Sequence, residues 1–430
     1  MMRIAIAALA LLLAAPVTAA AQARAERCRV QLVSASDSGG FLGRSYFASG
    51  DVRLRCAGQP ITMETDSVIA HASGDVEFHG YMRYRDTTVA IDARQAYYRK
   101  STETWEARGN VLVRNLETGS TVRGPAIDYL RPSAGVRDSA EVYATGRPRV
   151  EYVETDSTPG EATEPYIIVS DRLRSRGNAL IWAGGRVTVD RSDMSARGDS
   201  LALDTGAGDR GTLLGQPVFR GLGADSFALS GARIDFELEQ RRLSYIRAER
   251  RAHLVRAEWD LVADTIAADL VDGKVEQLLA WGDSTRPNAT SARHAVRGDS
   301  VVFDLPGEVL RQVRAFGHAW VAGEADSASG ERDWLSGDTV TADFARTADA
   351  DSADADSAGP SLTRLAARHD ARSFHRVEPR RAGDPPSIAY VRGNAITITM
   401  APGGKESVER VEVEGQVEGV QLDPAGEEGP

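Results

Sequence analysis

"GDSLALD", from Gly198 to Asp204, is a heptapeptide that the chain repeats with small changes. Each copy has apolar residues at its fourth and sixth positions and a mostly polar or small residue between them. The other copies are GARIDFE from Gly231, ADTIAAD from Ala263, GDSVVFD from Gly298, GDTVTAD from Gly337 and GNAITIT from Gly393. Because a strand projects successive side chains to opposite faces, apolar residues two positions apart predict half-buried β-strands.

A second element lies between these copies and follows the pattern L-x-x-L-x-A-x-G-x-A. Examples are LSYIRAERRA from Leu243, LRQVRAFGHA from Leu310 and LTRLAARHDA from Leu362. The Gly-Asp and Gly-Asn pairs near both elements favour turns or bulges, because glycine accepts a positive φ. No stretch beyond residue 23 has helical periodicity. The sequence therefore predicts an all-β fold of stacked antiparallel strands, built from repeated units.

Two short motifs in and beside the first repeat match well-known binding motifs. The tripeptide RGD at 197–199 is that of cell-adhesion ligands, and the glycines at 206, 208 and 211 have the G-x-G-x-x-G spacing of dinucleotide-binding turns. The tripeptide recurs at 297–299, and the glycines open no helix that could hold a pyrophosphate. We interpret the first motif as a turn at a repeat boundary and the second as a hairpin loop.

The first 23 residues have the features of a secretory signal peptide. Arg3 precedes an apolar run from Ile4 to about Val17, and small residues end at Ala23. A transmembrane anchor is the alternative, but the apolar run is too short to span a bilayer comfortably. We therefore expect cleavage after Ala23 and export of a soluble mature chain.

Composition and cysteine content narrow the function further. The chain has 51 basic and 62 acidic residues and a net charge of −11, which argues against nucleic-acid binding because that function needs a clustered basic patch. Cys28 and Cys56 are the two cysteines. In an oxidising compartment such a pair predicts a disulfide rather than a metal site, which needs three or four ligands. This bond would constrain the unfolded chain by roughly 3–4 kcal/mol.

The sequence contains no recognisable catalytic motif. Its seven histidines are scattered, and none is spaced with cysteines or carboxylates as in metal sites. No G-x-S-x-G, H-E-x-x-H or P-loop motif occurs. The recurrent acids Asp204, Glu237, Asp269 and Asp304 suggest calcium-binding repeats or surface carboxylates, and their spacing favours the second. We expect no enzymatic activity, no cofactor and no metal.

Three segments of the N-terminal half carry a resemblance to a known family. They are FASGDVRL from Phe47, ASGDVEFHG from Ala72 and EARGNVLVRNLETGSTVRGPAIDYL from Glu106. These segments resemble the organic-solvent-tolerance (OstA-like) domain of lipopolysaccharide-transport proteins, the LptA family, in which Gly-Asp-Val or Gly-Asn-Val starts a strand. The match extends from about Tyr46 to Val153 and recurs more weakly to about Val420.

The resemblance implies an open, twisted β-jellyroll with an apolar interior. Members of this family hold the acyl chains of lipopolysaccharide in that groove and join end to end across the periplasm. It therefore implies a periplasmic lipopolysaccharide-binding bridge toward the outer membrane, with other OstA-like proteins as partners by end-to-end strand pairing. The candidate groove residues, which alternate with polar neighbours, are Val52, Leu54, Ile61, Met63, Val76, Phe78, Val89, Ile91, Val111, Val113, Ile127 and Tyr129.

The chain is longer than the short members of the family. We expect the OstA-like β-jellyroll at 24–193 and repeats of the same type at 194–348. An insertion with a low-complexity stretch and one strand region follows at 349–386, and a final repeat with a polar C-terminal tail at 387–430. The alternative function is an exported structural β-solenoid or surface interaction protein that binds no lipid. The sequence leaves open whether the interior is accessible to ligand or filled by the protein's own side chains.

Overall fold

The described part of the chain is all-β. The computed structural model describes residues 28–40, 44–153, 164–206, 208–223, 226–239, 242–256, 259–325, 332–345, 360–377, 386–401 and 408–423. These residues form 31 strands in one sheet and one short 3-10 helix at Pro306–Glu308. Every strand pairing among them is antiparallel. The predicted signal peptide and the low-complexity stretch at 349–359 lie outside the described residues.

The sheet is folded lengthwise into two walls that share one bent edge. We call the wall that contains β2 the first wall and the wall that contains β1 the second wall. Thirteen strands pass through the bend and belong to both walls: β3 (Tyr46–Cys56), β4 (Thr62–Ala70), β5 (Val76–Arg85), β8 (Thr104–Asn115), β9 (Thr121–Leu130), β14 (Leu180–Arg191), β15 (Met194–Asp204), β20 (Arg242–Arg256), β21 (Trp259–Val271), β26 (Gln312–Ala325), β27 (Arg332–Ala345), β28 (Ser361–Val377) and β29 (Ser387–Met400).

The remaining strands are shorter and stay within one wall. Those of the first wall are β2 (Asp37–Gly40), β7 (Gln95–Arg99), β10 (Glu141–Thr145), β13 (Arg172–Arg176), β16 (Arg210–Leu214), β19 (Arg233–Glu239), β22 (Lys274–Trp281), β25 (Ser300–Asp304) and β30 (Val408–Glu414). Those of the second wall are β1 (Val30–Ser34), β6 (Val89–Ala93), β11 (Arg149–Tyr152), β12 (Tyr166–Val169), β17 (Val218–Gly221), β18 (Phe227–Ser230), β23 (Asn288–Thr290), β24 (Ala295–Arg297) and β31 (Glu418–Leu422).

In six of the thirteen bent strands, two consecutive residues in the left-handed region make the bend. In β3 they are Gly50 (φ 76°) and Asp51 (φ 45°), and the pairing with β4 shifts register between Ser49 and Val52. We call such residues corner pairs. The others inside strands are Gly109-Asn110, Gly185-Arg186, Arg250-Arg251, Gly317-His318 and His369-Asp370, whereas Gly146-Arg147 and Gly215-Gln216 lie in the connections from β10 to β11 and from β16 to β17. A bulge of this kind turns a strand without ending it, so one strand contributes to both walls.

The corner pairs correct one expectation from the sequence. Gly50-Asp51-Val52 and Gly109-Asn110-Val111 do not start strands but lie inside β3 and β8. In the bent strands a buried alanine lies two positions before the first corner residue and a buried alanine or valine two positions after it, as Ala315 and Ala319 do around Gly317. The repeated A-x-G-x-A pattern of the second sequence element is therefore a corner rather than a connection between strands.

The interpretation of RGD at 197–199 as a turn is wrong. These residues lie inside β15, where Gly198 is opposite Val187 of β14. The copy at 297–299 joins β24 to β25, and the Asp299 N–H donates to the carbonyl oxygens of Phe316 and Gly317. Both copies therefore face the corner of a neighbouring strand. Of the G-x-G-x-x-G glycines, two lie in the predicted hairpin connection between β15 and β16 and the third lies within β16.

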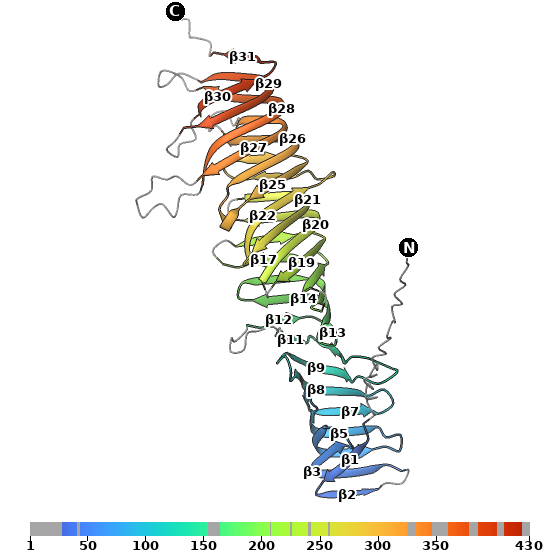
Figure 1. Cartoon of the computed structure of the whole chain (residues 1–430). Coiled ribbons are helices and arrows are strands. Elements are labelled where there is room, and N and C mark those ends of the chain that lie inside the picture. Colours follow the sequence, from blue (N-terminus) through green and yellow to red (C-terminus); the bar gives the residue numbers. More distant parts are fainter. Residues whose placement is uncertain are drawn as a thin grey trace, which may run out of the picture.

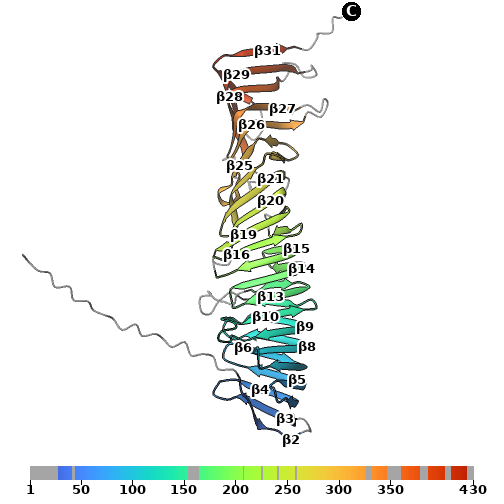
Figure 2. The same ribbon diagram turned by 90° about the vertical axis from the view of Figure 1, so that its right-hand side faces the viewer.

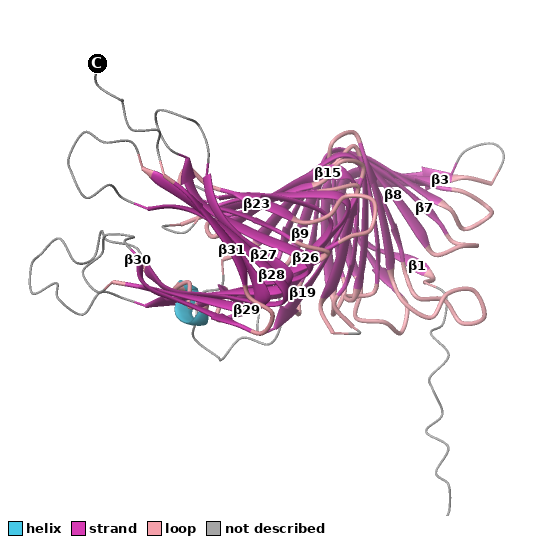
Figure 3. Cartoon of the chain, turned by 90° about the horizontal axis from the view of Figure 1, so that it is seen from above, coloured by secondary structure: helices cyan, strands magenta, loops and turns pink. Residues whose placement is uncertain are grey.

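The stacked strands give an elongated molecule. Figure 1 shows the chain passing from β2 and β3 at one end to β31 at the other, and Figure 2 shows the strands running across the long axis. Seen along that axis, the two walls diverge at the C-terminal end (Figure 3). At the expected boundary between 193 and 194 the sheet is continuous, because β14 and β15 pair along their whole length. Within the described ranges, no helix is long and apolar enough to cross a membrane.

Candidate functional site

The space between the two walls is the candidate site, because both walls turn their apolar faces toward it. All twelve candidate groove residues are buried, with exposed fractions between 0 and 7%. They belong to the same core cluster and come from both walls. Val52, Met63 and Ile91 lie in the second wall, for example, whereas Phe78 and Tyr129 lie in the first. The structure thus brings the twelve residues into one interior; their role in lipid binding stays a prediction.

Large aromatic side chains that sequence reasoning missed fill this interior in the N-terminal segment. The Trp105 ring is completely buried, and its centroid lies 4.6 Å from the centroids of Tyr84 and Tyr98 and 5.4 Å from that of Phe78. Burial raises the pKa of Tyr84 and of Tyr98 above the usual range, so both phenols stay protonated. The alternation of Met82 with Tyr84 was the signal in the sequence that could have added Tyr84 to the candidates.

The exposed fractions of the interior side chains show whether the N-terminal interior is open in this conformation. A side chain with no exposed surface contacts no space large enough for a water molecule, and an acyl chain is wider than a water molecule. Val52, Met63 and Phe78 have no exposed surface. The interior of this segment is therefore filled by the protein's own side chains.

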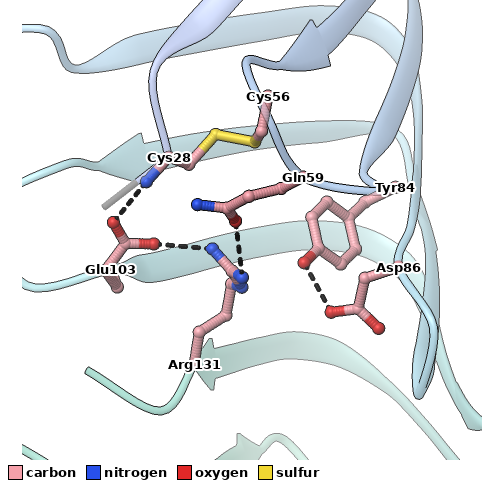
Figure 4. The surroundings of a disulfide bond; sticks show 7 residues. All are labelled: Cys28, Cys56, Gln59, Tyr84, Asp86, Glu103 and Arg131. Atoms are coloured by element: carbon pink, nitrogen blue, oxygen red, sulfur yellow. Dashed lines mark hydrogen bonds and ion pairs between the residues drawn. A yellow bond between two sulfur atoms is a disulfide. The ribbon is translucent and has the colours of Figure 1, made fainter. Parts of the chain in front are cut away.

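Polar residues connect the free margins of the two walls across this interior (Figure 4). Glu103 precedes β8 at the margin of the first wall, and its carboxylate accepts the backbone N–H of Cys28 from the second wall at 2.8 Å. Arg131, which follows β9, donates to Glu103 at 2.8 Å and to the side chain of Gln59 at 3.2 Å. Glu103 is 2% and Arg131 14% exposed. We call Gln59, Glu103, Arg131 and Cys28 the margin latch, because their contacts hold the two walls together.

The predicted pairing of Cys28 with Cys56 is present as a disulfide beside the margin latch (Figure 4). Both cysteines are buried, and the bond fixes the start of the described chain to the end of β3. The hydroxyl of Tyr84 donates to Asp86 at 2.7 Å on the same side of the interior. The disulfide therefore holds Cys28, and with it the latch contact to Glu103, in place.

The interior becomes more accessible at the C-terminal end. Ile396 of β29 is still completely buried, and Val420 and Leu422 of β31, which are 58% and 61% exposed, lie beside Tyr390 and Ile388 on the outer face of the second wall. Val411 and Val413 of β30 are only half-buried. The connections from β26 to β27, β27 to β28, β28 to β29 and β29 to β30 fall largely outside the described residues.

The recurrent acids do not gather into a site. Glu237 pairs with Arg210 at 3.0 Å, and Asp304 pairs with Arg314 at 3.0 Å. Asp204 accepts the backbone N–H of Gly206 at 3.0 Å. In the described part of the chain, no three His, Cys, Asp or Glu side chains are placed to hold a metal ion. These carboxylates therefore serve local ion pairs and turns.

Comparison of the chain with protein-family models and with curated proteins finds no match to either.

Proposed function

We propose that this protein is an exported lipid carrier of the OstA-like type. In this proposal the two walls form an open, twisted β-jellyroll built from repeated units, and their interior shelters the acyl chains of lipopolysaccharide in the periplasm. Other OstA-like proteins would receive the lipid at one end and deliver it at the other, toward the outer membrane. The order of the corner motifs along the chain and the shape of the sheet support this assignment.

The observation that carries the proposal is the continuous apolar interior between walls that are joined along one edge. A single cluster of buried side chains extends from β3 to β29. The described strand pairings run along the walls and through the bend, and none of them joins one free margin to the other, so the free margins can separate without breaking a backbone ladder. Burial of each CH₂ group of an acyl chain there contributes roughly 0.8 kcal/mol. Opening at the margins would thus admit a lipid, and the margin latch is the barrier in the N-terminal segment.

The disulfide supports the proposed compartment. Disulfides persist in oxidising compartments such as the periplasm and are rare in the cytosol. Cys28 lies five residues after the proposed cleavage at Ala23, so the bond would remain in the mature chain. Mass mapping of unreduced protein from a periplasmic extract checks this: peptides linked through Cys28 and Cys56 are expected, with a mature N-terminus at Arg24.

The second candidate function is a rigid structural or surface interaction protein without a lipid ligand. The filled interior around Trp105 favours it, because packed side chains need no ligand to bury their apolar surface. The two functions differ in one property: only the lipid carrier opens its margins in the cell.

Site-specific photo-crosslinking distinguishes these functions. A photo-reactive residue at Ile91 points into the interior, whereas one at the exposed Arg53 of β3 points outward. Capture of lipopolysaccharide in cells at Ile91 but not at Arg53 is the expected result. Arg131→Met breaks the margin latch. If separation of the free margins limits the entry of lipopolysaccharide, this variant should increase its capture at Ile91. A folded protein that captures no lipid at Ile91, with or without the latch, would favour the structural function.

A further inference from the structure

A groove on the outer side of the bend, away from the apolar interior, gathers positive charge. It has a volume of about 740 Å³ and lies in the middle of the molecule, over the corners of β14 to β20. Five arginines line it: Arg147, Arg186, Arg197, Arg250 and Arg251. The carboxylate in the lining is Asp199. The chain as a whole carries a net charge of −11, so this groove departs from the surrounding charge.

Among the described residues, three of the five guanidinium groups have no acidic partner. Arg147 and Arg186 both donate to Asp171, at 3.3 and 2.7 Å. Within the described residues, Arg197, Arg250 and Arg251 make no ion pair. Asp171 and Asp199 therefore leave an excess of about three positive charges over the groove. Arginines without an acidic partner are stable in water, and a group of them can also bind an anionic ligand.

The backbone under two of these arginines is strained. Arg250 (φ 60°) and Arg251 (φ 56°) both occupy the left-handed region, whereas most other corner pairs begin with glycine. A side chain there costs conformational energy that glycine avoids. Both side chains are exposed, so burial of apolar surface does not compensate for this cost. The two adjacent arginines thus line the groove at a conformational cost that glycine would avoid.

We propose that this groove binds a ligand with two or more phosphate groups. Guanidinium groups bind phosphate oxygens in a two-pronged geometry, and several of them around one groove favour a ligand with closely spaced charges over a single phosphate. The excess of three positive charges matches a diphosphate, which carries three to four negative charges near neutral pH. The site is separate from the proposed lipid-binding interior and does not depend on it.

Calorimetric titration of the full mature chain with sodium pyrophosphate tests the proposal. Binding at low salt that weakens as salt rises is expected, because the contacts are exposed. In Arg250→Gln/Arg251→Gln the dissociation constant should rise at least tenfold. The matched control is Arg53→Gln/Arg55→Gln, which removes the same charge from the outer face of β3 and should leave affinity unchanged. Undetectable pyrophosphate and vesicle binding, or equal loss in both variants, would overturn the proposal.

A second variant separates binding from folding. Arg250→Gly/Arg251→Asn copies the corner Gly109-Asn110 and should relieve the backbone strain. We expect its thermal unfolding midpoint to rise while pyrophosphate affinity falls, a combination that a purely structural role of these arginines would not produce. Loss of stability with unchanged affinity would contradict the proposal.

A third measurement identifies the source of the phosphates. Vesicles of phosphatidylcholine with cardiolipin, whose headgroup carries two phosphates, should sediment the wild-type chain, and the Arg250→Gln/Arg251→Gln variant should remain in solution, if the ligand is a lipid headgroup. Pyrophosphate binding without vesicle binding would assign a soluble phosphorylated ligand instead. Vesicle binding that is identical in wild type and variant would show that the groove does not contribute to it, and would count against the proposal.

Discussion

At the scale of single residues, the fold depends on glycines that lie under an acidic side chain of the neighbouring strand. At Gly185 an added Cβ atom would lie 2.5 Å from a carboxylate oxygen of Asp171, and at Gly80 it would lie 2.6 Å from the Cβ atom of Asp66. Both glycines also have a positive φ. Two separate constraints, backbone conformation and close approach, thus favour glycine at these bends.

A pair of glycine substitutions separates the two constraints. Gly119→Ala meets no atom within 4 Å at φ 77°, so it should cost only the left-handed penalty of about 1 kcal/mol. Gly80→Ala has the same type of penalty and also displaces Asp66, so we expect about 3 kcal/mol. Urea unfolding of both variants measures these costs. Equal losses would show that Asp66 moves away freely and that close approach is unimportant.

The margin latch contains a buried ion pair whose loss should be expensive. Arg131→Met leaves the carboxylate of Glu103 buried without its cation, which typically costs about 3–5 kcal/mol. Arg149→Met removes an exposed partner of Glu151 at 3.5 Å and should cost under about 1 kcal/mol. Urea unfolding, followed by tryptophan fluorescence, compares the two variants. Similar midpoints for both would mean that the latch does not stabilise the closed interior.

At the scale of the elements, alternation in the sequence predicted which side chains are buried. It could not predict that a strand bends at Gly50-Asp51. Ala48 and Val52 are four residues apart and both buried, which is also what an unbent strand would give. Corners without glycine, such as Arg250-Arg251, keep only the flanking alanines Ala248 and Ala252 as a sequence signal. The predicted strand starts were therefore wrong in position, whereas the predicted apolar face was buried as a set.

The margin latch was also invisible in the sequence. Glu103 and Arg131 lie in connections after strands, 75 and 72 residues from their partners Cys28 and Gln59. Contacts at such separations depend on how the stack of strands twists, which local patterns do not record. The sequence therefore predicted an apolar interior but not what closes it.

The pairing of strands with near neighbours in sequence has a consequence for truncation. Residues 24–193 contain complete pairings from β1 to β14, the disulfide and the margin latch. Because stability in such arrays is close to a sum over neighbouring units, this fragment should fold alone. Its circular dichroism spectrum should be β-rich with a cooperative thermal transition. A random-coil spectrum, with the full chain folded, would contradict this local organisation.

At the scale of the whole molecule, both ends of the sheet present unpaired backbone. In the described chain, β1 and β2 pair only with β3, and β30 and β31 pair only with β29. Exposed apolar side chains accompany these edges, including Leu32 and Val33 at one end. Unpaired strand edges with apolar side chains favour pairing with another chain. β31 carries one charged side chain, Glu418, and its apolar Val420 and Leu422 are exposed.

End-to-end pairing should therefore be measurable as self-association of the purified chain. Sedimentation velocity over a range of concentrations should show linear oligomers, and Val420→Lys/Leu422→Lys should weaken association by about tenfold or more, because lysines on an edge strand oppose pairing. Val271→Lys is the control, because Val271 is 59% exposed at the end of β21 in the middle of the molecule. It should associate like the wild type. A monomer at every concentration, or equal weakening by the control, would contradict pairing through β31 and leave its apolar edge without a role in self-assembly.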